Sequence, residues 1–174
     1  ILYAPTFTAN RIKLAEYGLQ DELQDMVRRL TEISREAASC AGRFVYVAGD
    51  LTMTGAQLKP MGDMEPEELI SVYKEQILAL CGAGVDLLAV ETMMSLGEAR
   101  AALIAAKEVC DLPVMVTMTF EGDGRTLYGT DAETAAVVLE SLGACAIGVN
   151  CSAGPARMRE IVSAMAGATK LPIV

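Results

Sequence analysis

The chain has 174 residues, of which 52% are hydrophobic and 21% are charged, and its formal net charge is −9. This composition excludes a disordered chain, and the negative charge excludes a basic surface for nucleic acid or anionic membranes. We therefore expect a globular protein with a single domain over residues 1–174 and with neither nucleic acid nor a membrane as a partner.

The cysteines and the absence of histidine limit the chemistry. The five cysteines are widely spaced and odd in number, which predicts reduced thiols and, together with the lack of an apolar run of roughly 18 residues, a cytoplasmic protein. Without histidine, catalysis must use carboxylates, thiols, hydroxyls or a metal held without imidazole. Four cysteines follow no metal spacing, and packing accounts for them: Cys40, Cys81, Cys110 and Cys145.

Short apolar runs alternate with stretches of helical spacing along the chain. The runs predict six strands, at Ile1–Ala4, Phe44–Ala48, Leu87–Val90, Val114–Thr119, Ala146–Val149 and Leu171–Val174. After the first run, Asn10 is a plausible helix cap, and a long helix is expected from about residue 21 to just before residue 42.

The later helices carry start and stop signals. Pro66 opens a helix that Gly84 closes, and Pro155 opens the last one. Between them, two capping boxes predict helix starts, because an acid follows a hydroxyl residue by three positions. These pairs are Ser95 with Glu98 and Thr130 with Glu133.

Strands joined by helical crossovers must be parallel and covered on both faces. This pattern fits either a βα barrel or a doubly wound sheet. In both folds ligands bind at the carboxyl ends of the strands, so the residues that end each run are the candidate site residues.

Three of these strand-end segments are distinctive. They are Glu91-Thr92-Met93, the stretch from Val116 to Phe120 that runs on to Gly129-Thr130-Asp131, and the stretch from Gly148 to Pro155. Together they resemble the homocysteine S-methyltransferase family, and especially the homocysteine-binding barrel module of cobalamin-dependent methionine synthases. The resemblance implies an α/β fold of the (βα)8 TIM-barrel type that is incomplete in this chain, with about six βα units.

The same resemblance implies a zinc site. In the family, three cysteines bind zinc at the barrel mouth, and the sulfur of homocysteine takes the fourth position. Cys151 matches the cysteine of the family's Asn-Cys-x-x-Gly-Pro motif, whereas the remaining two ligands belong to a Gly-Gly-Cys-Cys segment that this chain lacks. Zinc deprotonates a bound thiol, and an open fourth position lets the substrate thiolate attack a methyl group.

The resemblance also assigns substrate-binding residues. Glu91 is expected to bind the amino group of homocysteine, and Asn150, Thr119 and Asp50 are further candidates. Other uses of these residues remain open at this point. Glu91 could interact with a helix macrodipole, Asp50 and Thr119 could serve in turns or caps, and Cys151 could be a small apolar filler.

The predicted function is that of a homocysteine S-methyltransferase fragment that makes methionine, with methylcobalamin or methyltetrahydrofolate as the methyl source. The expected partners are homocysteine and cobalamin- and folate-binding modules, fused or separate. One thiolate cannot close a zinc site, so the chain alone is expected to hold no zinc and to show no turnover, and its open strand edges favour a homo-oligomer. The alternatives are another TIM-barrel transferase or lyase that binds a pterin or a phosphate, and a non-catalytic barrel fragment.

Overall fold

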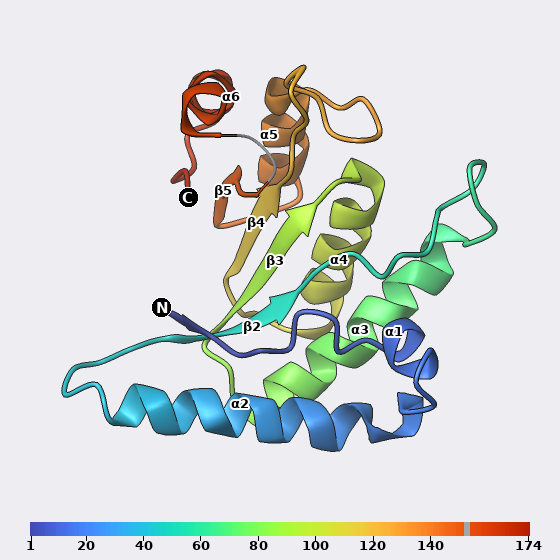
Figure 1. Ribbon diagram of the computed structural model, residues 1–174, viewed down its shortest axis with the longest axis vertical. Helices are drawn as coiled ribbons and strands as arrows, with labels where there is room; N and C mark the ends of the chain where they lie inside the picture. Colours follow the sequence, from blue (N-terminus) through green and yellow to red (C-terminus); the bar gives the residue numbers. More distant parts are fainter. Residues whose placement is uncertain (152–153) are drawn as a thin grey trace.

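The computed structural model describes residues 1–151 and 154–174. Within these residues, five parallel strands alternate with helices (Figure 1). The strands lie side by side in chain order, which confirms the predicted α/β fold of parallel βα units. They are β1 (Leu2–Tyr3), β2 (Val47–Leu51), β3 (Leu87–Met93), β4 (Val114–Met118) and β5 (Ala146–Val149).

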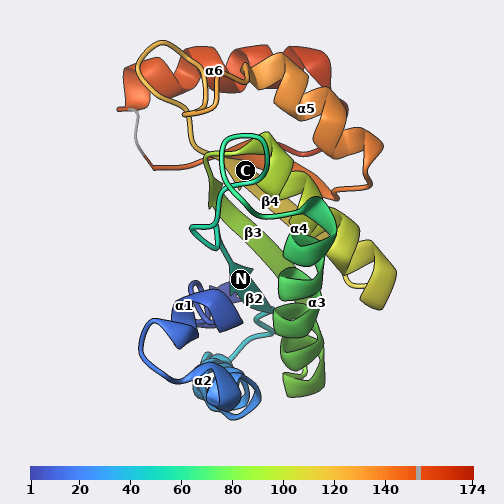
Figure 2. The same ribbon diagram turned by 90° about the vertical axis from the view of Figure 1, so that its right-hand side faces the viewer.

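The helices form an arc round the sheet. Figure 2 shows α3 and α4 beside the strands, with α2 at one end of the arc and α5 and α6 at the other. This is the arrangement expected of the wall of a βα barrel. The helices are α1 (Arg11–Ala15), α2 (Leu23–Ser39), α3 (Pro66–Ala83), α4 (Leu96–Val109), α5 (Ala132–Ser141) and α6 (Pro155–Ala168), and a 3-10 turn (Gln20–Glu22) precedes α2.

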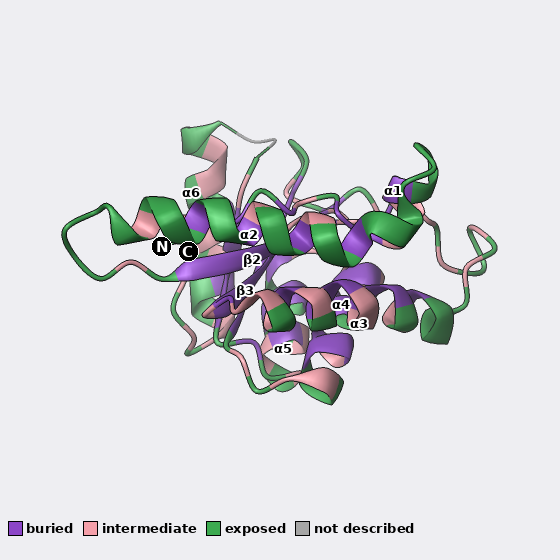
Figure 3. Ribbon diagram, turned by 90° about the horizontal axis from the view of Figure 1, so that it is seen from below, coloured by how far each residue is buried: buried purple, intermediate pink, exposed green. Residues whose placement is uncertain are grey.

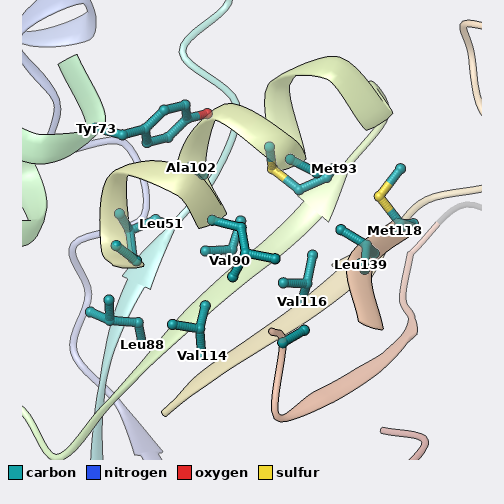
Figure 4. Close-up of a cluster of buried hydrophobic side chains, with 14 of the residues drawn as sticks. Leu51, Tyr73, Leu88, Val90, Met93, Ala102, Val114, Val116, Met118 and Leu139 are labelled. Carbon is teal, nitrogen blue, oxygen red and sulfur yellow. The ribbon is translucent and has the colours of Figure 1, made fainter. Parts of the chain in front are cut away.

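The two faces of the sheet have separate hydrophobic cores. On the helix side, strand residues such as Val90 and Val116 pack with helix residues such as Ala102 and Leu139 (Figure 4). The other face carries a smaller cluster of strand residues: Ala48, Leu87, Ala89, Met115 and Ala146. Because strand side chains alternate between faces, this second face corresponds to the interior of a barrel.

Helix α2 buries a single stripe of residues. In α2 the buried residues are Leu23, Val27, Thr31 and Ser34, three or four positions apart, and the rest of the helix surface is largely exposed (Figure 3). No helix in the two described stretches is long and apolar enough to cross a membrane.

Several predicted helix ends are confirmed. The side chain of Asn10 accepts a hydrogen bond from Lys13 N at the start of α1, and Ser95 Oγ accepts one from Glu98 N at the start of α4. Gly84 ends α3 with φ at 80°, a left-handed conformation that glycine adopts without a steric penalty.

One predicted helix start and part of the cysteine prediction are wrong. Helix α5 is capped by Asp131, whose carboxylate accepts from Thr134 N at 2.8 Å, and Thr130 lies one position before the cap. A carboxylate is as good a cap as a hydroxyl, so the local pattern did not separate the two. Cys40 and Cys145 are exposed rather than packed, whereas Cys81 and Cys110 are half-buried against the helix-side core.

Several predicted strands have different limits in the structure, and β3 runs three residues further than predicted, to Met93. The strand expected at Phe44–Ala48 starts at Val47 and continues to Leu51, while the exposed rings of Phe44 and Tyr46 meet edge to face with centroids 4.7 Å apart. The run Leu171–Val174 forms one parallel bridge, between Ile147 and Ile173, rather than a strand. It still extends the chain order of the sheet beyond β5.

The capping box predicted at α4 is only half formed. The carboxylate of Glu98 does not return to the backbone of Ser95. Its Oε1 atom accepts from Thr54 N at 2.6 Å and from Thr54 Oγ1 at 2.7 Å, and the hydroxyl of Tyr73 lies 2.9 Å away. Glu98 is 2% exposed, so these neutral donors replace the water that the buried carboxylate has lost.

Leu80 and Leu78 provide a matched test of this packing. Leu80 is fully buried in α3, and its Cδ atoms lie 2.9 Å from where a Cβ on Gly49 would be, whereas Leu78 is 54% exposed. Leu80→Ala should lower the free energy of unfolding by about 2 to 5 kcal/mol, because it leaves a cavity. Leu78→Ala should change it by no more than about 0.5 kcal/mol. Urea denaturation followed by circular dichroism measures both, and equal losses would contradict the assigned helix face.

Candidate functional site

Strand β3 carries a β-bulge near its carboxyl end. Val90 pairs with Val116 on β4, and Met93 pairs with Met118. Strand β3 therefore uses three residue steps where β4 uses two. One extra residue is inserted into β3 at this point.

The bulge turns two consecutive side chains toward the barrel interior. Val90 and Met93 both belong to the helix-side core (Figure 4). Glu91 and Thr92 lie between them: the charge of Glu91 acts on Asp50 of β2, and Thr92 Oγ1 accepts a hydrogen bond from Asn150 after β5. In a regular strand only one of these two residues could face the interior, because successive side chains point to opposite faces.

The backbone at the bulge is unusual. Thr92 has φ at 60°, in the left-handed region that a β-branched residue rarely adopts. Its backbone N–H lies within 3.4 Å of Thr117 Oγ1, which accepts the hydrogen bond. Thr117 thus satisfies a donor at the point where the regular pairing is interrupted.

Strands β3, β4 and β5 meet in a polar cluster at their carboxyl ends. Asn150 Nδ2 donates to Thr92 Oγ1 at 2.9 Å, and the hydroxyl of Thr119 donates to the backbone oxygen of Asn150 at 3.2 Å. Thr92 Oγ1 also lies 3.8 Å from Cys151 Sγ. Three of the predicted site residues, Thr119, Asn150 and Cys151, are therefore brought together, and Thr92 joins β3 to them.

Two carboxylates face the same interior. Asp50 pairs with Ala89, two residues before Glu91, so the strand register places both acids on one face. Asp50 is 6% exposed, and its Oδ1 has no hydrogen-bond partner in the described part of the chain. Burial, followed by the charge of Glu91, raises the pKa of Asp50 to about 8, and burial also raises the pKa of Glu91. Such a pair can be stabilised by a cation placed beside it.

Tyr3 is a site residue that the sequence analysis missed. It pairs with Ala48, two residues before Asp50, and so lies on the same face. The pKa of Tyr3 is raised by burial and then by the charges of Glu91 and Asp50. The register of β1 against β2 carries this information, but a two-residue strand gives almost no pattern in the sequence.

The structure narrows the alternative uses of the predicted residues. Glu91 lies inside β3, four residues before the cap of α4, so it is not a first-turn carboxylate. Asp50 lies inside β2 and caps no helix in the described residues. Cys151 is exposed, with φ at 57°, and is therefore not an apolar filler.

Cys151 is the only thiol in this cluster of described residues. Across residues 1–151 and 154–174, no three His, Cys, Asp or Glu residues lie close enough to hold a metal ion. A free, exposed thiol at a strand end fits one position of a thiolate metal site. Two residues of the surrounding motif, Ser152 and Ala153, lie outside the described residues.

The whole chain, residues 1–174, matches the model of a family described as Homocysteine S-methyltransferase. The chain belongs to the homocysteine S-methyltransferase family. It is 30% identical over 176 residues to methionine synthase from Mycobacterium tuberculosis and, equally, to methionine synthase from Mycobacterium leprae. Both matches cover 97% of the chain, which spans only 15% and 14% of the lengths of these two relatives.

Solved structures of this family and of another share the fold. The metallated form of the homocysteine methyltransferase MmuM from Escherichia coli matches with a TM-score of 0.84 at 20% identity, over 99% of this chain and 64% of that one. The carboxyl transferase domain of Rhizobium etli pyruvate carboxylase with pyruvate matches with a TM-score of 0.57 at 17% identity, over 99% and 27%. At these identities the likeness shows the barrel fold alone.

The raised pKa of Asp50 predicts a pH dependence of stability. The folded pKa of about 8 lies above the ordinary value of 3.8, so between these values the folded chain binds the proton more tightly than the unfolded chain. The free energy of unfolding should therefore fall as the pH rises from about 4 to about 8, and should level off above that. When the free energy of unfolding is measured by urea denaturation and plotted against pH, Asp50→Asn should show a flatter slope than the unchanged chain. A part of the slope should remain, because the pKa of Glu91 is also raised. Asp111→Asn, at an exposed position after α4, should keep the full slope. Identical slopes for Asp50→Asn and the unchanged chain would sink this assignment.

Proposed function

We propose that this chain forms the larger part of a barrel that binds homocysteine as a zinc thiolate and methylates it to methionine. The observation that carries the proposal is one cluster at the strand ends. There, an exposed thiol in the family's cysteine motif lies in a hydrogen-bonded group beside two inward-facing carboxylates. Membership of the homocysteine S-methyltransferase family supports the choice of acceptor.

Cys151 would supply one of the zinc ligands. Its sulfur is exposed and lies next to the hydroxyl of Thr92, at the carboxyl ends of the strands. The other ligands would come from sequence outside this chain. When bound, zinc keeps sulfur ligands deprotonated at neutral pH and so makes a substrate thiol nucleophilic.

Glu91 and Asp50 would bind the amino end of the substrate. Glu91 is half-buried on the interior face and can accept hydrogen bonds from an ammonium group. Asp50 lies deeper, and because its pKa is about 8, it is largely protonated at neutral pH in the free chain. A neighbouring ammonium favours the ionised carboxylate, so Asp50 would release its proton as the substrate binds.

Asn150 and Thr119 would hold the strand end that carries the sulfur. The bond from Thr119 to the backbone oxygen of Asn150 ties the end of β5 to the end of β4. The side-chain amide of Asn150 already donates a hydrogen bond to Thr92 across the cluster. These two residues therefore act mainly on the position of Cys151 and only secondarily on the substrate.

The wider assignments are part of the same proposal. The methyl group would come from methylcobalamin or methyltetrahydrofolate on cobalamin- and folate-binding modules, fused or separate, which the likeness to mycobacterial methionine synthases supports. We also propose that residues 1–174 act as a single domain, that the protein works in the cytoplasm, and that it forms a homo-oligomer.

Removing the sulfur tests the zinc site. In a complete barrel that contains this segment, Cys151→Ser should reduce bound zinc from about one ion per molecule to a small fraction, because the site loses a thiolate donor. Cys145→Ser is the matched control, since Cys145 is also exposed and lies six positions earlier. Metal analysis after dialysis measures both. Full zinc retention in Cys151→Ser would remove the proposed site.

Removing the charge of Glu91 tests the substrate assignment. Glu91→Gln should raise KM for homocysteine by about 10- to 100-fold, because it weakens a charge-assisted hydrogen bond to the amino group. It should leave KM for 4-mercaptobutyrate, the same thiol without the amino group, nearly unchanged. Glu108→Gln, at an exposed position on α4, is the control for a generic loss of charge. Equal effects on both thiols would show that Glu91 does not contact the amino group.

A further inference from the structure

The hydroxyl of Thr92 has two hydrogen-bond partners in the cluster. Asn150 Nδ2 donates to Thr92 Oγ1 at 2.9 Å, so the oxygen accepts on that side. The hydroxyl has one hydrogen of its own, and Cys151 Sγ lies 3.8 Å away. When Cys151 is a thiolate, its sulfur has no hydrogen to donate, so it can only accept the hydrogen of this hydroxyl.

The orientation of the Asn150 amide supports this direction. The hydroxyl of Thr119 lies 3.4 Å from Asn150 Oδ1, on the acceptor side of the amide. That leaves the Nδ2 group facing Thr92. The four residues thus form a chain in which hydrogen bonds run from Asn150 to Thr92 and from Thr92 to Cys151.

The backbone is arranged to keep the two ends of this chain together. Thr92 and Cys151 are the two non-glycine residues with positive φ among the described residues, and they lie near the carboxyl ends of β3 and β5, on either side of β4. The bulge in β3 is what brings Thr92 to the interior side at all. An uncommon conformation persists where surrounding contacts hold it, as the bonds from Thr92 N to Thr117 and from Asn150 to Thr92 do here.

We propose that Thr92 is a positioning residue that donates a hydrogen bond to the sulfur of Cys151, fixes its direction and lowers its nucleophilicity. The inference rests on the proposed function, which places two kinds of thiolate at one zinc ion. A methyl donor must then react with the substrate sulfur and not with the ligand sulfur. A hydrogen bond to the ligand thiolate withdraws electron density from it, and so it favours methylation of the substrate.

Alkylation of the chain itself tests this role. Iodoacetamide reacts with a thiolate by forming a carbon–sulfur bond as iodide leaves, and the reaction is run at about pH 10, where free thiols in general are deprotonated. The rate at Cys151 is divided by the rates at Cys40 and Cys145, two exposed cysteines of the same molecule, by peptide mass spectrometry. Half-buried Cys81 and Cys110 report folding in the same digest, because unfolding would expose them.

Three variants separate the hydroxyl from the shape of the side chain. Thr92→Val keeps the branched shape without the hydroxyl, Thr92→Ala removes both, and Thr92→Ser keeps the hydroxyl. We expect the relative rate at Cys151 to rise about threefold or more in the Val and Ala variants, as one hydrogen bond to the sulfur is lost, and to stay at the original value in the Ser variant.

Two results would overturn the inference. One is an unchanged relative rate in both hydroxyl-free variants. The other is a rise in Thr92→Ser equal to that in Thr92→Val. Because alkylation requires neither zinc nor homocysteine, either result would leave the proposed function standing. Full zinc retention by Cys151→Ser in a complete barrel would instead remove the proposed function without changing the alkylation rates of the Thr92 variants.

Discussion

The extra residue in β3 is the constraint on which the candidate site depends. Side chains alternate along a strand, so a regular β3 would turn Thr92 into the helix-side core and leave only Glu91 facing the interior. The bulge places a carboxylate and a hydroxyl next to each other at the mouth. The bulge requires Thr92, a β-branched residue, to adopt a left-handed conformation, and it interrupts the pairing with β4. The hydrogen bonds that Thr117 and Asn150 make with Thr92 stabilise this arrangement. Glu91, which faces Asp50, and Thr92, which contacts Cys151, are consecutive residues. The bulge therefore joins the carboxylates of the site to its thiol.

Asp50 and Glu98, two buried acids, have different surroundings. Below the mouth lies the small apolar cluster of strand residues, and Asp50 sits directly above it in the register, with little water to solvate its charge. A second buried acid, Glu98, stays outside this layer and is fully occupied by donors from Thr54 and Tyr73. That network holds the segment after β2, from which Thr52 donates to the backbone oxygen of Glu91. One acid thus fixes the scaffold, while the unpartnered oxygen of Asp50 remains free for a ligand.

The sequence was sufficient for the order of elements and insufficient for the details that complete the site. Parallel strands and most helix ends follow from local signals such as alternation, proline starts and glycine ends, and Asn150 and Cys151 were identified because they lie in a distinctive motif. The bulge was not predictable, because one inserted residue leaves an apolar run that looks regular. For the same reason Thr92 was seen as part of a motif but not as a member of the cluster. Errors at Phe44, Thr130 and Cys145 arose where local propensity competes with packing that only the folded chain defines.

The spacing of the strands can be compared with the length of the proposed substrate. Glu91 lies on β3 and Cys151 follows β5, two strands away, so at a strand spacing of about 4.8 Å their backbones are separated by roughly 10 Å. Side chains shorten this gap, as the 3.8 Å between Thr92 Oγ1 and Cys151 Sγ shows. An amino group and a sulfur joined by three carbons span roughly 5 Å by ordinary bond lengths. A hydrogen bond of about 2.8 Å at one end and two zinc–sulfur bonds of about 2.3 Å at the other bring the total to roughly 12 Å, so the proposed substrate is long enough to join the two groups. The carboxyl transferase domain shares the fold at 17% identity, so the choice of ligand belongs to the side chains at the strand ends and not to the barrel itself.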